Sequence, residues 1–184
     1  MGFVMQRVEL AGVGILQPSV FEDTRGFFKE MYNRPAFEQI GLTEAFVQDN
    51  LSRSSLGTVR GLHFQAPPFS QGKLVTVLEG EVLDVVVDLR KGSPTYGQSF
   101  SIVLAQNRHT MLYVPPGFAH GFSVLSASCL FYYKCTAVFH KPAEGGIRWN
   151  DPDLAIDWRV SAPLVSAKDQ DLPFLKDFDS PFSL

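Results

Sequence analysis

Two short segments of the sequence each hold a histidine in a setting that could carry chemistry. His63 stands between Leu62 and Phe64, and His120 follows a Pro-Pro-Gly turn at 115–117. Histidine is a base suited to neutral pH and also a common metal ligand. Taken alone, a histidine between two apolar residues is more often a hydrogen-bonded core residue. These two residues therefore have three candidate roles: base, metal ligand or core residue.

The spacing Pro-x-Gly-x-x-His that ends at His120 resembles the second motif of the cupins, small β-barrels made of two packed sheets. Cupins that bind a metal usually have His-x-His, followed by Glu, as their first motif. In this chain Gln65 stands where the second histidine would be, and an amide is a poor ligand for a transition metal. We therefore expect no metal. His109 and His140 fall in or near predicted loops, where we expect solvent around them.

A histidine that removes a proton from carbon needs two kinds of help. A carboxylate must orient its other ring nitrogen, and a cation or hydrogen-bond donor must stabilise the negative charge that results. Lys73, at the start of a predicted strand, and Lys134 could supply that donor. Tyr132 and Tyr133 are adjacent, so strand alternation lets only one of them point into a barrel. Both could also be ordinary strand aromatics.

The elements that must position these side chains are predicted to be mainly β-strands. Short apolar runs separated by turn signals are typical of a sandwich or barrel. They cover residues 75–78, 82–89, 100–104, 110–114, 122–125 and 130–138, and a strand, a turn at 23–26 and a second strand are expected over 15–32. A short helix is expected over 35–40, closed by Gly41. The sequence thus predicts an all-β fold with a few short helices.

The predicted strand 82–89 has one wholly apolar face, and its other face carries Asp84 between Val82 and Val86. The pattern leaves two interpretations open: a polar group inside a barrel, or a surface residue on a half-solvated strand. If Asp84 lies inside, we expect it to hydrogen-bond His120. A separation of more than about 5 Å between them would exclude that bond.

Length and composition limit the class of protein. At about 150 residues per domain, 184 residues predict one domain over 1–184, with the Asp- and Pro-rich residues 150–184 as a C-terminal wrap. A net charge of −3 argues against a general nucleic-acid binder. Because the sequence has no apolar run long enough for a membrane span and no signal-peptide pattern, we expect no membrane partner and a cytoplasmic location. Cys129 and Cys135 are expected to be free thiols.

Over residues 15–170 the sequence resembles the dTDP-4-dehydrorhamnose 3,5-epimerase family, metal-independent members of the cupin superfamily. The first matching segments are FEDTRGFFKE (21–30), QDNLS (48–52), RGLHFQ (60–65), QGKLV (71–75) and DVVVDLR (84–90). They continue with GSPT (92–95), VPPGFAHGF (114–122), YKCT (133–136), EGGIRWNDP (144–152) and SAKD (166–169). The resemblance implies a cupin-type double-stranded β-helix, or jelly-roll barrel, that uses no cofactor.

The family inverts C3 and C5 of dTDP-4-dehydro-6-deoxy-glucose and gives dTDP-4-dehydro-L-rhamnose, a step of dTDP-L-rhamnose biosynthesis. Both carbons neighbour the C4 ketone, so loss of either hydrogen leaves an enolate. The resemblance implies that His63 is the base and that Asp169 holds it. It also implies that Tyr133 returns a proton on the opposite face and that Lys73 stabilises the enolate oxygen.

The resemblance also implies a set of substrate-binding residues, mostly charged or amide side chains that suit a nucleotide diphosphate. They are Arg25, Glu30, Gln48, Asn50, Arg60, Lys73, His120, Glu144 and Lys168, together with Phe139 at the position of an aromatic ring that stacks on thymine. Many relatives have Tyr at that position, but stacking needs only the ring. Strict alternation would turn Arg60 and His63 to opposite faces, so we expect Gly61 to break the pleat.

The family forms homodimers, which implies that the strand pair within 15–32 joins the neighbour's sheet and that Arg25 and Glu30 complete the neighbour's pocket. Three alternatives remain open. They are action on another 4-keto-6-deoxy nucleotide sugar or at one carbon only, a metal-dependent oxygenase of the cupin type, and a non-catalytic sugar-binding barrel. Deuterium incorporation, metal analysis and the substitution His63→Ala would distinguish them in turn.

Overall fold

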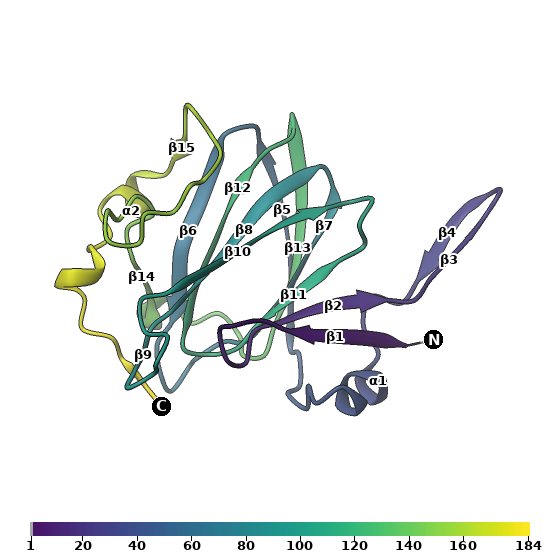
Figure 1. The fold of residues 1–184 in the computed structure, drawn as a ribbon, viewed down its shortest axis with the longest axis horizontal. Coiled ribbons are helices and arrows are strands. Elements are labelled where there is room, and N and C mark those ends of the chain that lie inside the picture. Colours follow the sequence, from purple (N-terminus) through teal and green to yellow (C-terminus); the bar gives the residue numbers. More distant parts are fainter. Residues whose placement is uncertain (1) are drawn as a thin grey trace.

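Two antiparallel β-sheets face each other and form a barrel in the computed structural model, which describes residues 2–184 (Figure 1). The first sheet has the order β1 (Phe3–Arg7), β2 (Gly14–Pro18), β11 (Met111–Val114), β7 (Lys73–Glu79), β13 (Ser128–Cys135) and β5 (Gln48–Ser55). The second has the order β10 (Ser99–Ala105), β8 (Glu81–Asp88), β12 (Phe118–Val124), β6 (Thr58–Gln65) and β14 (Glu144–Gly146), and β15 (Leu164–Val165) pairs with β6. The all-β prediction is confirmed.

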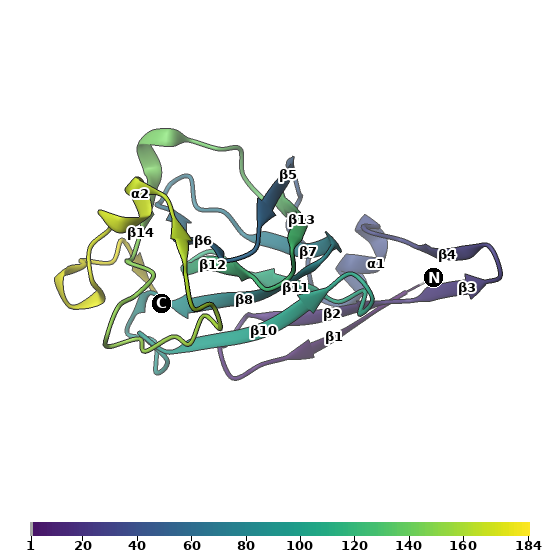
Figure 2. The same ribbon diagram turned by 90° about the horizontal axis from the view of Figure 1, so that it is seen from above.

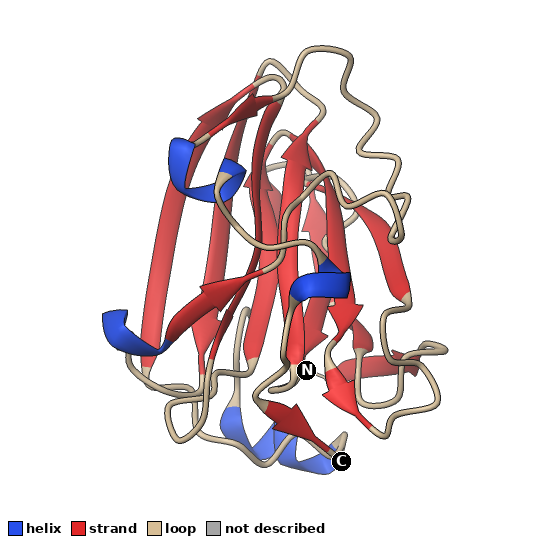
Figure 3. Ribbon diagram, turned by 90° about the vertical axis from the view of Figure 1, so that its left-hand side faces the viewer, coloured by secondary structure: helices blue, strands red, loops and turns tan. Residues whose placement is uncertain are grey.

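Helices are short and lie at the margins of the barrel (Figure 3). They are α1 (Arg34–Gln39), α2 (Ala167–Gln170) and the 3₁₀ turns Lys141–Ala143 and Leu175–Asp177. The predicted helix at 35–40 is α1, in which the Asn33 side chain accepts a hydrogen bond from the Ala36 backbone N–H and Gly41 follows with a φ of +88°. Among residues 2–184, no helix is long and apolar enough to cross a membrane.

Strand β8 is buried on both faces, because a different layer covers each one. Val82 and Val86 point between the sheets, where they pack with residues of β7, β12 and β13. Val85 and Val87 point outward, where the C-terminal segment covers them with Trp158 and other apolar side chains. The yellow-green C-terminal chain runs over this outer face in Figure 1. This double burial explains why the central strand is so rich in valine.

The chain leaves β8 through a tight turn that Asp88 organises. The Asp88 carboxylate is fully buried and accepts hydrogen bonds from the Arg90 side chain and backbone and from the hydroxyls of Ser93 and Thr95. Burial alone would raise the pKa of Asp88, but these hydrogen bonds outweigh it and lower the pKa from 3.8 to about 2. Beyond this turn, β9 (Arg90–Lys91) pairs with β16 (Phe182–Ser183) near the C-terminus.

Strands β3 (Val20–Asp23) and β4 (Gly26–Lys29) form a hairpin that projects from the barrel, as Figures 1 and 2 show. Phe21, Phe27 and Phe28 on this hairpin are each more than half exposed. Arg25 lies at its tip and pairs with Asp23 at 2.6 Å. The predicted strand–turn–strand within 15–32 therefore exists as β3 and β4. The first residues of that range belong instead to β2 of the first sheet.

The two remaining histidines are not surrounded by solvent, so that expectation was wrong. The His109 ring lies 4.6 Å from the Phe27 ring, and its Nδ1 is 3.3 Å from Lys29 Nζ. The His140 ring stacks on Phe69 at 3.7 Å. Both are loop residues, but aromatic neighbours from distant parts of the chain shield them. Cys129 and Cys135 are free thiols, as predicted.

Candidate active site

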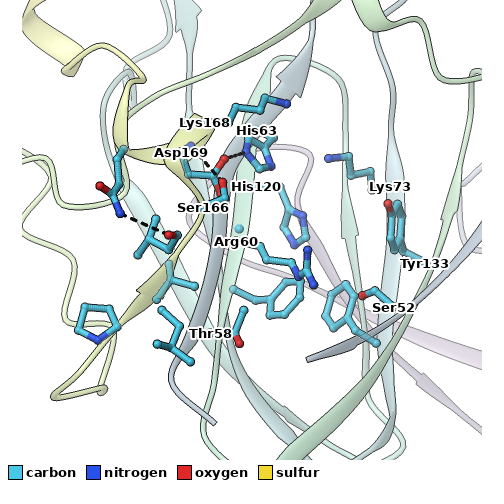
Figure 4. Close-up of a pocket in the computed structure, with 18 residues that line it drawn as sticks. Ser52, Thr58, Arg60, His63, Lys73, His120, Tyr133, Ser166, Lys168 and Asp169 are labelled. Atoms are coloured by element: carbon cyan, nitrogen blue, oxygen red, sulfur yellow. Dashed lines mark hydrogen bonds and ion pairs between the residues drawn. The ribbon is translucent and has the colours of Figure 1, made fainter. Parts of the chain in front are cut away.

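A cavity of about 750 Å³ lies between the two sheets, and the C-terminal segment forms one side of it (Figure 4). The second sheet contributes Thr58, Val59, Arg60, His63, His120, Gly121 and Phe122 to the lining, and the first contributes Ser52, Lys73, Phe131 and Tyr133. Pro163, Leu164, Val165, Ser166, Lys168, Asp169 and Gln170 complete the lining. Five of the residues predicted to act on or bind a substrate thus reach one cavity from the two sheets, and two more reach it from the C-terminal segment.

His63 and Asp169 form a hydrogen-bonded pair at one wall of the cavity. Asp169 Oδ1 lies 2.7 Å from His63 Nε2, and the second carboxylate oxygen accepts the Gly61 backbone N–H at 3.3 Å. Burial opposes ionisation of Asp169, but the hydrogen bond and charge of His63 and the Gly61 N–H outweigh it and lower the pKa. An ionised Asp169 only accepts hydrogen bonds, so Nε2 carries the proton and Nδ1 of His63 is free to act as a base.

The local sequence folds this way because of helix α2. Ser166 is its N-cap residue, and its side chain accepts the Asp169 backbone N–H. This cap begins a single turn of helix beside β6, and the turn aims Asp169 at His63. The carboxylate is buried, whereas the His63 ring keeps 26% of its surface exposed to the cavity. The buried carboxylate therefore orients the His63 ring, and the ring stays accessible from the cavity.

Gly61 breaks the pleat of β6, as predicted. His63 pairs with His120 and Arg60 pairs with Phe122, so β6 has one residue more than β12 between the two pairs. Gly61 has a φ of +128°, and a Cβ atom there would lie 2.6 Å from Gly121 Cα. The extra residue turns Arg60 and His63 to the same side, and both line the cavity.

Lys73 and Tyr133 face this wall from the first sheet (Figure 4). Tyr133 pairs with Val75, two residues from Lys73, so alternation places both side chains on one face. Burial raises the pKa of the Tyr133 phenol, which therefore keeps its proton at neutral pH. Burial lowers the pKa of Lys73, and the charges of Asp84 and Glu144 act against that shift.

The other candidates of the same types lie outside the cavity. Tyr132 faces the opposite side of β13, and Lys134 Nζ is 3.4 Å from its hydroxyl and 2.5 Å from Asp49 Oδ1. Lys134 also lies over the Tyr32 ring. Of each pair of candidates named from the sequence, the structure thus brings only Lys73 and Tyr133 to the cavity.

His120 lies beside His63 in the lining of the cavity and is hydrogen-bonded to Asp84. The expected bond is confirmed: His120 Nε2 is 2.9 Å from Asp84 Oδ1 and 3.0 Å from Asp84 Oδ2. Asp84 is fully buried inside the barrel, which settles the two interpretations of the strand pattern. The rings of Phe122 and Phe131, which also line the cavity, stack at 4.2 Å and give it an apolar wall.

At the rim, Lys168 and Glu144 form an ion pair, with Nζ 2.5 Å from Oε1. Lys168 lines the cavity, whereas Glu144 is not among the lining residues. On the second sheet, Arg60 Nε donates to Ser54 Oγ at 3.1 Å, which steadies the guanidinium at the cavity wall. Lys168 and Arg60 are the cations that an anionic ligand would meet on entering.

Gln48, Asn50 and Phe139 lie outside the lining and form a connected group. Gln48 Nε2 donates to Asn50 Oδ1 at 2.9 Å, and Gln48 Oε1 accepts the Phe139 backbone N–H at 2.7 Å. The Phe139 ring itself is 54% exposed. Arg25 lies at the tip of the β3–β4 hairpin and Glu30 directly after it, and neither lines the cavity.

Gln65, which stands where metal-binding cupins have a histidine, fixes two loops. Its Nε2 donates to the carbonyls of Phe69 and Val138, and its Oε1 accepts the His140 N–H at 2.7 Å. Its amide is thus fully used by backbone groups around the loop that carries Phe139. No group of three or more His, Cys, Asp and Glu that could hold a metal ion occurs within residues 2–184.

Reasoning from the sequence missed several lining residues. Ser52, Thr58 and Phe131 lie in strands, and Leu164 and Val165 join the cavity only because β15 runs parallel to β6. Alternation from Tyr133 could have found Phe131, two residues away on the same strand. No signal marks the 163–165 stretch, because its position depends on how the C-terminal segment docks.

Known proteins are similar to this chain in both sequence and fold. The sequence model of the dTDP-4-dehydrorhamnose 3,5-epimerase family matches residues 7–177. Curated enzymes of that name from Pseudomonas aeruginosa and Shigella flexneri are 48% and 47% identical, over 94% and 89% of this chain and 96% and 91% of theirs. The crystal structure of a dTDP-6-deoxy-D-glucose-3,5-epimerase from Legionella pneumophila, in complex with dTDP-4-keto-L-rhamnose, superimposes with a TM-score of 0.93. It has 44% identity and covers 96% of this chain and 95% of that one. The cupin-type jelly roll is thereby confirmed.

Proposed function

Because the chain belongs to the dTDP-4-dehydrorhamnose 3,5-epimerase family, we propose that it inverts C3 and C5 of dTDP-4-dehydro-6-deoxy-glucose. The product is dTDP-4-dehydro-L-rhamnose, and the enzyme is an isomerase of dTDP-rhamnose synthesis. One observation carries the chemical part of the proposal. His63 and Tyr133 stand on facing sheets of a single cavity, with Lys73 beside Tyr133.

The first step is removal of a proton next to the C4 ketone. Nδ1 of His63 takes the hydrogen of C3 or C5, and the electron pair of the C–H bond moves into a carbon–carbon double bond. The carbonyl electrons move onto the C4 oxygen, which becomes an enolate. Asp169 stabilises the protonated ring, and a positioned base of this kind contributes about 10²–10⁴ in rate.

The enolate must be stabilised and then protonated from the other side. Lys73 reaches the cavity from the first sheet and can donate a hydrogen bond to the enolate oxygen, and such a donor contributes most where water is excluded. Tyr133 keeps its phenolic proton and faces the base, so protonation by Tyr133 inverts the carbon. The phenolate then recovers a proton from solvent, and His63 releases the one it took.

The nucleotide half of the substrate needs cations and a flat apolar surface. We assign the diphosphate to Arg60 and Lys168, which meet the solvent at the cavity wall. The base is assigned to the exposed ring of Phe139, whose backbone N–H is held by Gln48. Glu144 and His120 complete the predicted binding group beside the sugar.

Deuterium incorporation from heavy water tests this function directly. With dTDP-4-dehydro-6-deoxy-glucose as substrate, we expect deuterium at both C3 and C5 and a product with both centres inverted. Deuterium at one carbon only would instead identify a single-site epimerase, and no incorporation would exclude the proposal. His63→Ala should remove nearly all incorporation while the protein still binds dTDP, whereas a non-catalytic sugar-binding barrel would be indifferent to this substitution.

We propose that the protein works as a homodimer and that the β3–β4 hairpin makes the contact. The hairpin projects from the barrel and exposes three phenylalanines. Its two strands of four residues each could pair with the edge of a sheet in a second subunit. Arg25 and Glu30, which do not line the cavity between the two sheets of their own barrel, would then reach the neighbour's site. The proposed location is the cytoplasm, a reducing compartment that suits the two free cysteines.

A further inference from the structure

A second histidine–aspartate pair lies directly beside the first. His120 on β12 and His63 on β6 are paired residues of adjacent strands, and both side chains reach the cavity (Figure 4). Each ring is hydrogen-bonded through Nε2 to a buried aspartate. The partner of His63 is Asp169 on helix α2, and the partner of His120 is Asp84 on β8. The proposed mechanism uses the first pair as a base and leaves the second pair without a defined chemical role.

The strand register places Asp84 behind His120. Val86 pairs with His120, and Asp84 is two residues away on the same face of β8. Both carboxylate oxygens lie within 3.0 Å of His120 Nε2, so one N–H is shared between them. Among residues 2–184, no other hydrogen bond reaches the Asp84 side chain, which is fully buried on the strand face that it shares with Val82 and Val86. His120 is therefore its one hydrogen-bonding partner in the described structure.

An aspartate in this position is costly unless its charge is balanced. A carboxylate beside a singly protonated imidazole would leave a net negative charge in the barrel core. Burial accordingly raises the pKa of Asp84, while the charges of His120 and Lys73 act in the opposite direction. The pair becomes neutral when it takes up one more proton. One proton then lies between Asp84 and Nε2, and the other is on Nδ1.

A proton on Nδ1 would be available to a ligand. No hydrogen bond from residues 2–184 occupies His120 Nδ1, although the ring lines the cavity. The charged and titratable groups around His120 are Arg60 and His63 from β6, Lys73 from β7, Asp84 from β8, Tyr133 from β13 and Asp169 from α2. Of these, Asp84 alone binds His120, so the protonation of this ring depends first on that aspartate.

We propose that Asp84 is a positioning residue that holds His120 with a proton on Nδ1, so that this N–H and the Lys73 ammonium together donate hydrogen bonds to the C4 oxygen of the sugar. The inference rests on the proposed function and assigns the second pair to that reaction. No bond of His120 breaks in the step, because the proton stays on Nδ1 while charge grows on the oxygen. Loss of hydrogen from C3 and loss from C5 charge the same oxygen, so one donor pair serves both inversions.

The substitution Asp84→Asn tests the proposal. Asparagine can still accept the Nε2–H but brings no charge, so we expect His120 to lose the second proton. The expected result is a kcat about 10²-fold lower with KM within about threefold of the unsubstituted enzyme, since a donor to a developing oxyanion acts in the transition state. Deuterium incorporation at C3 and C5 should slow by the same factor, because both enolates share one oxygen.

Asp88→Asn is the matched control. Asp88 is equally buried on the same face of the same strand, but its partners are Arg90, Ser93 and Thr95 outside the cavity. Asp88→Asn should lower stability and leave kcat unchanged. A kcat for Asp84→Asn equal to that of the Asp88→Asn control would overturn the proposal. So would slowing at C3 alone or at C5 alone.

A measurement on the unsubstituted protein avoids dependence on the folding of a variant. The ¹⁵N signals of His120, assigned by their absence in His120→Gln, should show protons on both ring nitrogens at pH 7. A ring with one proton across pH 6–8 would refute the inference. If the unsubstituted enzyme incorporates deuterium at both carbons while Asp84→Asn matches it, the proposed function stands and only this inference fails. If the unsubstituted enzyme incorporates none, the proposed function fails.

Discussion

Asp169 Oδ1 lies 2.7 Å from Nε2 of His63, although 106 positions separate the two residues in the sequence. Their proximity depends on the C-terminal segment, which packs on the outer face of the second sheet and places helix α2 beside β6. The base belongs to the barrel, and its orienting group belongs to the segment that covers it. Removing only the charge of that orienting group is therefore a precise test of the pair.

Asp169→Asn should lower kcat by about 10³-fold with little change in KM. The amide can still fill the space, but it no longer stabilises the protonated ring and it can turn the imidazole to the wrong tautomer. Steady-state kinetics with the dTDP-sugar measure both constants. A variant that loses affinity but keeps its turnover would assign Asp169 to binding and contradict the proposed pair.

Tyr133→Phe should separate proton removal from inversion. The phenyl ring keeps the packing against Phe131, whose ring centroid is 6.1 Å away, but the proton donor is lost. We expect His63 to continue exchanging hydrogen with solvent while inversion at the carbon that Tyr133 serves falls by about 10²-fold or more. Nuclear magnetic resonance of the sugar in heavy water follows exchange and inversion separately. Full inversion at both carbons in Tyr133→Phe would exclude the phenol as the acid.

Phe139 offers a test of the nucleobase assignment. Phe139→Ala should weaken dTDP binding by about tenfold, because base–aromatic stacking contributes about 1–3 kcal/mol. Phe139→Tyr should bind dTDP within about threefold of the unsubstituted protein, since the stacking face is retained. Isothermal titration calorimetry measures both dissociation constants. Equal affinity of Phe139→Ala and the unsubstituted protein for dTDP would mean that the nucleobase does not stack on Phe139.

The homodimer prediction can be tested through the hairpin. Phe28→Asp places a charge on a side chain that is 58% exposed, and we expect it to give a monomer in analytical ultracentrifugation. Tyr96→Asp, on an exposed turn away from the hairpin, is the control and should leave the oligomeric state unchanged. A protein that is monomeric before any substitution would contradict the dimer itself.

Complementation tests whether the sites are shared between subunits. Arg25→Ala and His63→Ala should each be nearly inactive, whereas a mixture allowed to exchange subunits should regain activity. In a mixed dimer, one site would combine the unsubstituted His63 of one subunit with the unsubstituted Arg25 of the other. A mixture as inactive as its components would mean that the hairpin completes no neighbouring site.

Asp88 links stability to pH. Its folded-state pKa of about 2 lies below the ordinary value of 3.8, so its contribution is fully present above about pH 4 and is lost as the pH falls toward 2. A shift of this size corresponds to about 2 kcal/mol. Asp88→Asn should therefore unfold at lower urea concentration than the unsubstituted protein at pH 7, and the difference should shrink below about pH 3. If the difference in urea stability between the two proteins stays constant from pH 7 to below about pH 3, the charge of Asp88 does not cause it.

Much of the barrel could be predicted because side chains alternate regularly along strands such as β8. The pattern of 82–89 placed Asp84 and Val86 on one face, and the observed register agrees. Gly61 was identified as a break in the pleat because the family resemblance places Arg60 and His63 on one face, which their spacing on a regular strand does not allow. Once Tyr133 is inside the barrel, alternation also sends Lys134 outside, which the contact with Asp49 confirms.

The rest depends on contacts between distant segments that no local pattern encodes. Strand β1 mixes polar and apolar residues over Phe3–Arg7, and it becomes a strand because β2 pairs with it. His140 lies in a loop, as expected, but Phe69 covers its ring. The partner of His63 came from family resemblance, because nothing near Asp169 in the sequence points to a histidine so far away.

The outer layer that seals strand β8 has a consequence for how the protein would fail. The same stretch of chain that hides Val85 and Val87 from water also delivers Asp169 to the base. A molecule that loses this layer on warming would retain its two sheets and Arg60, but it would lose Lys168 together with Asp169 and would turn over no substrate. Enzymatic decay should therefore run ahead of the melting of the strands, so that loss of turnover is an early sign of damage.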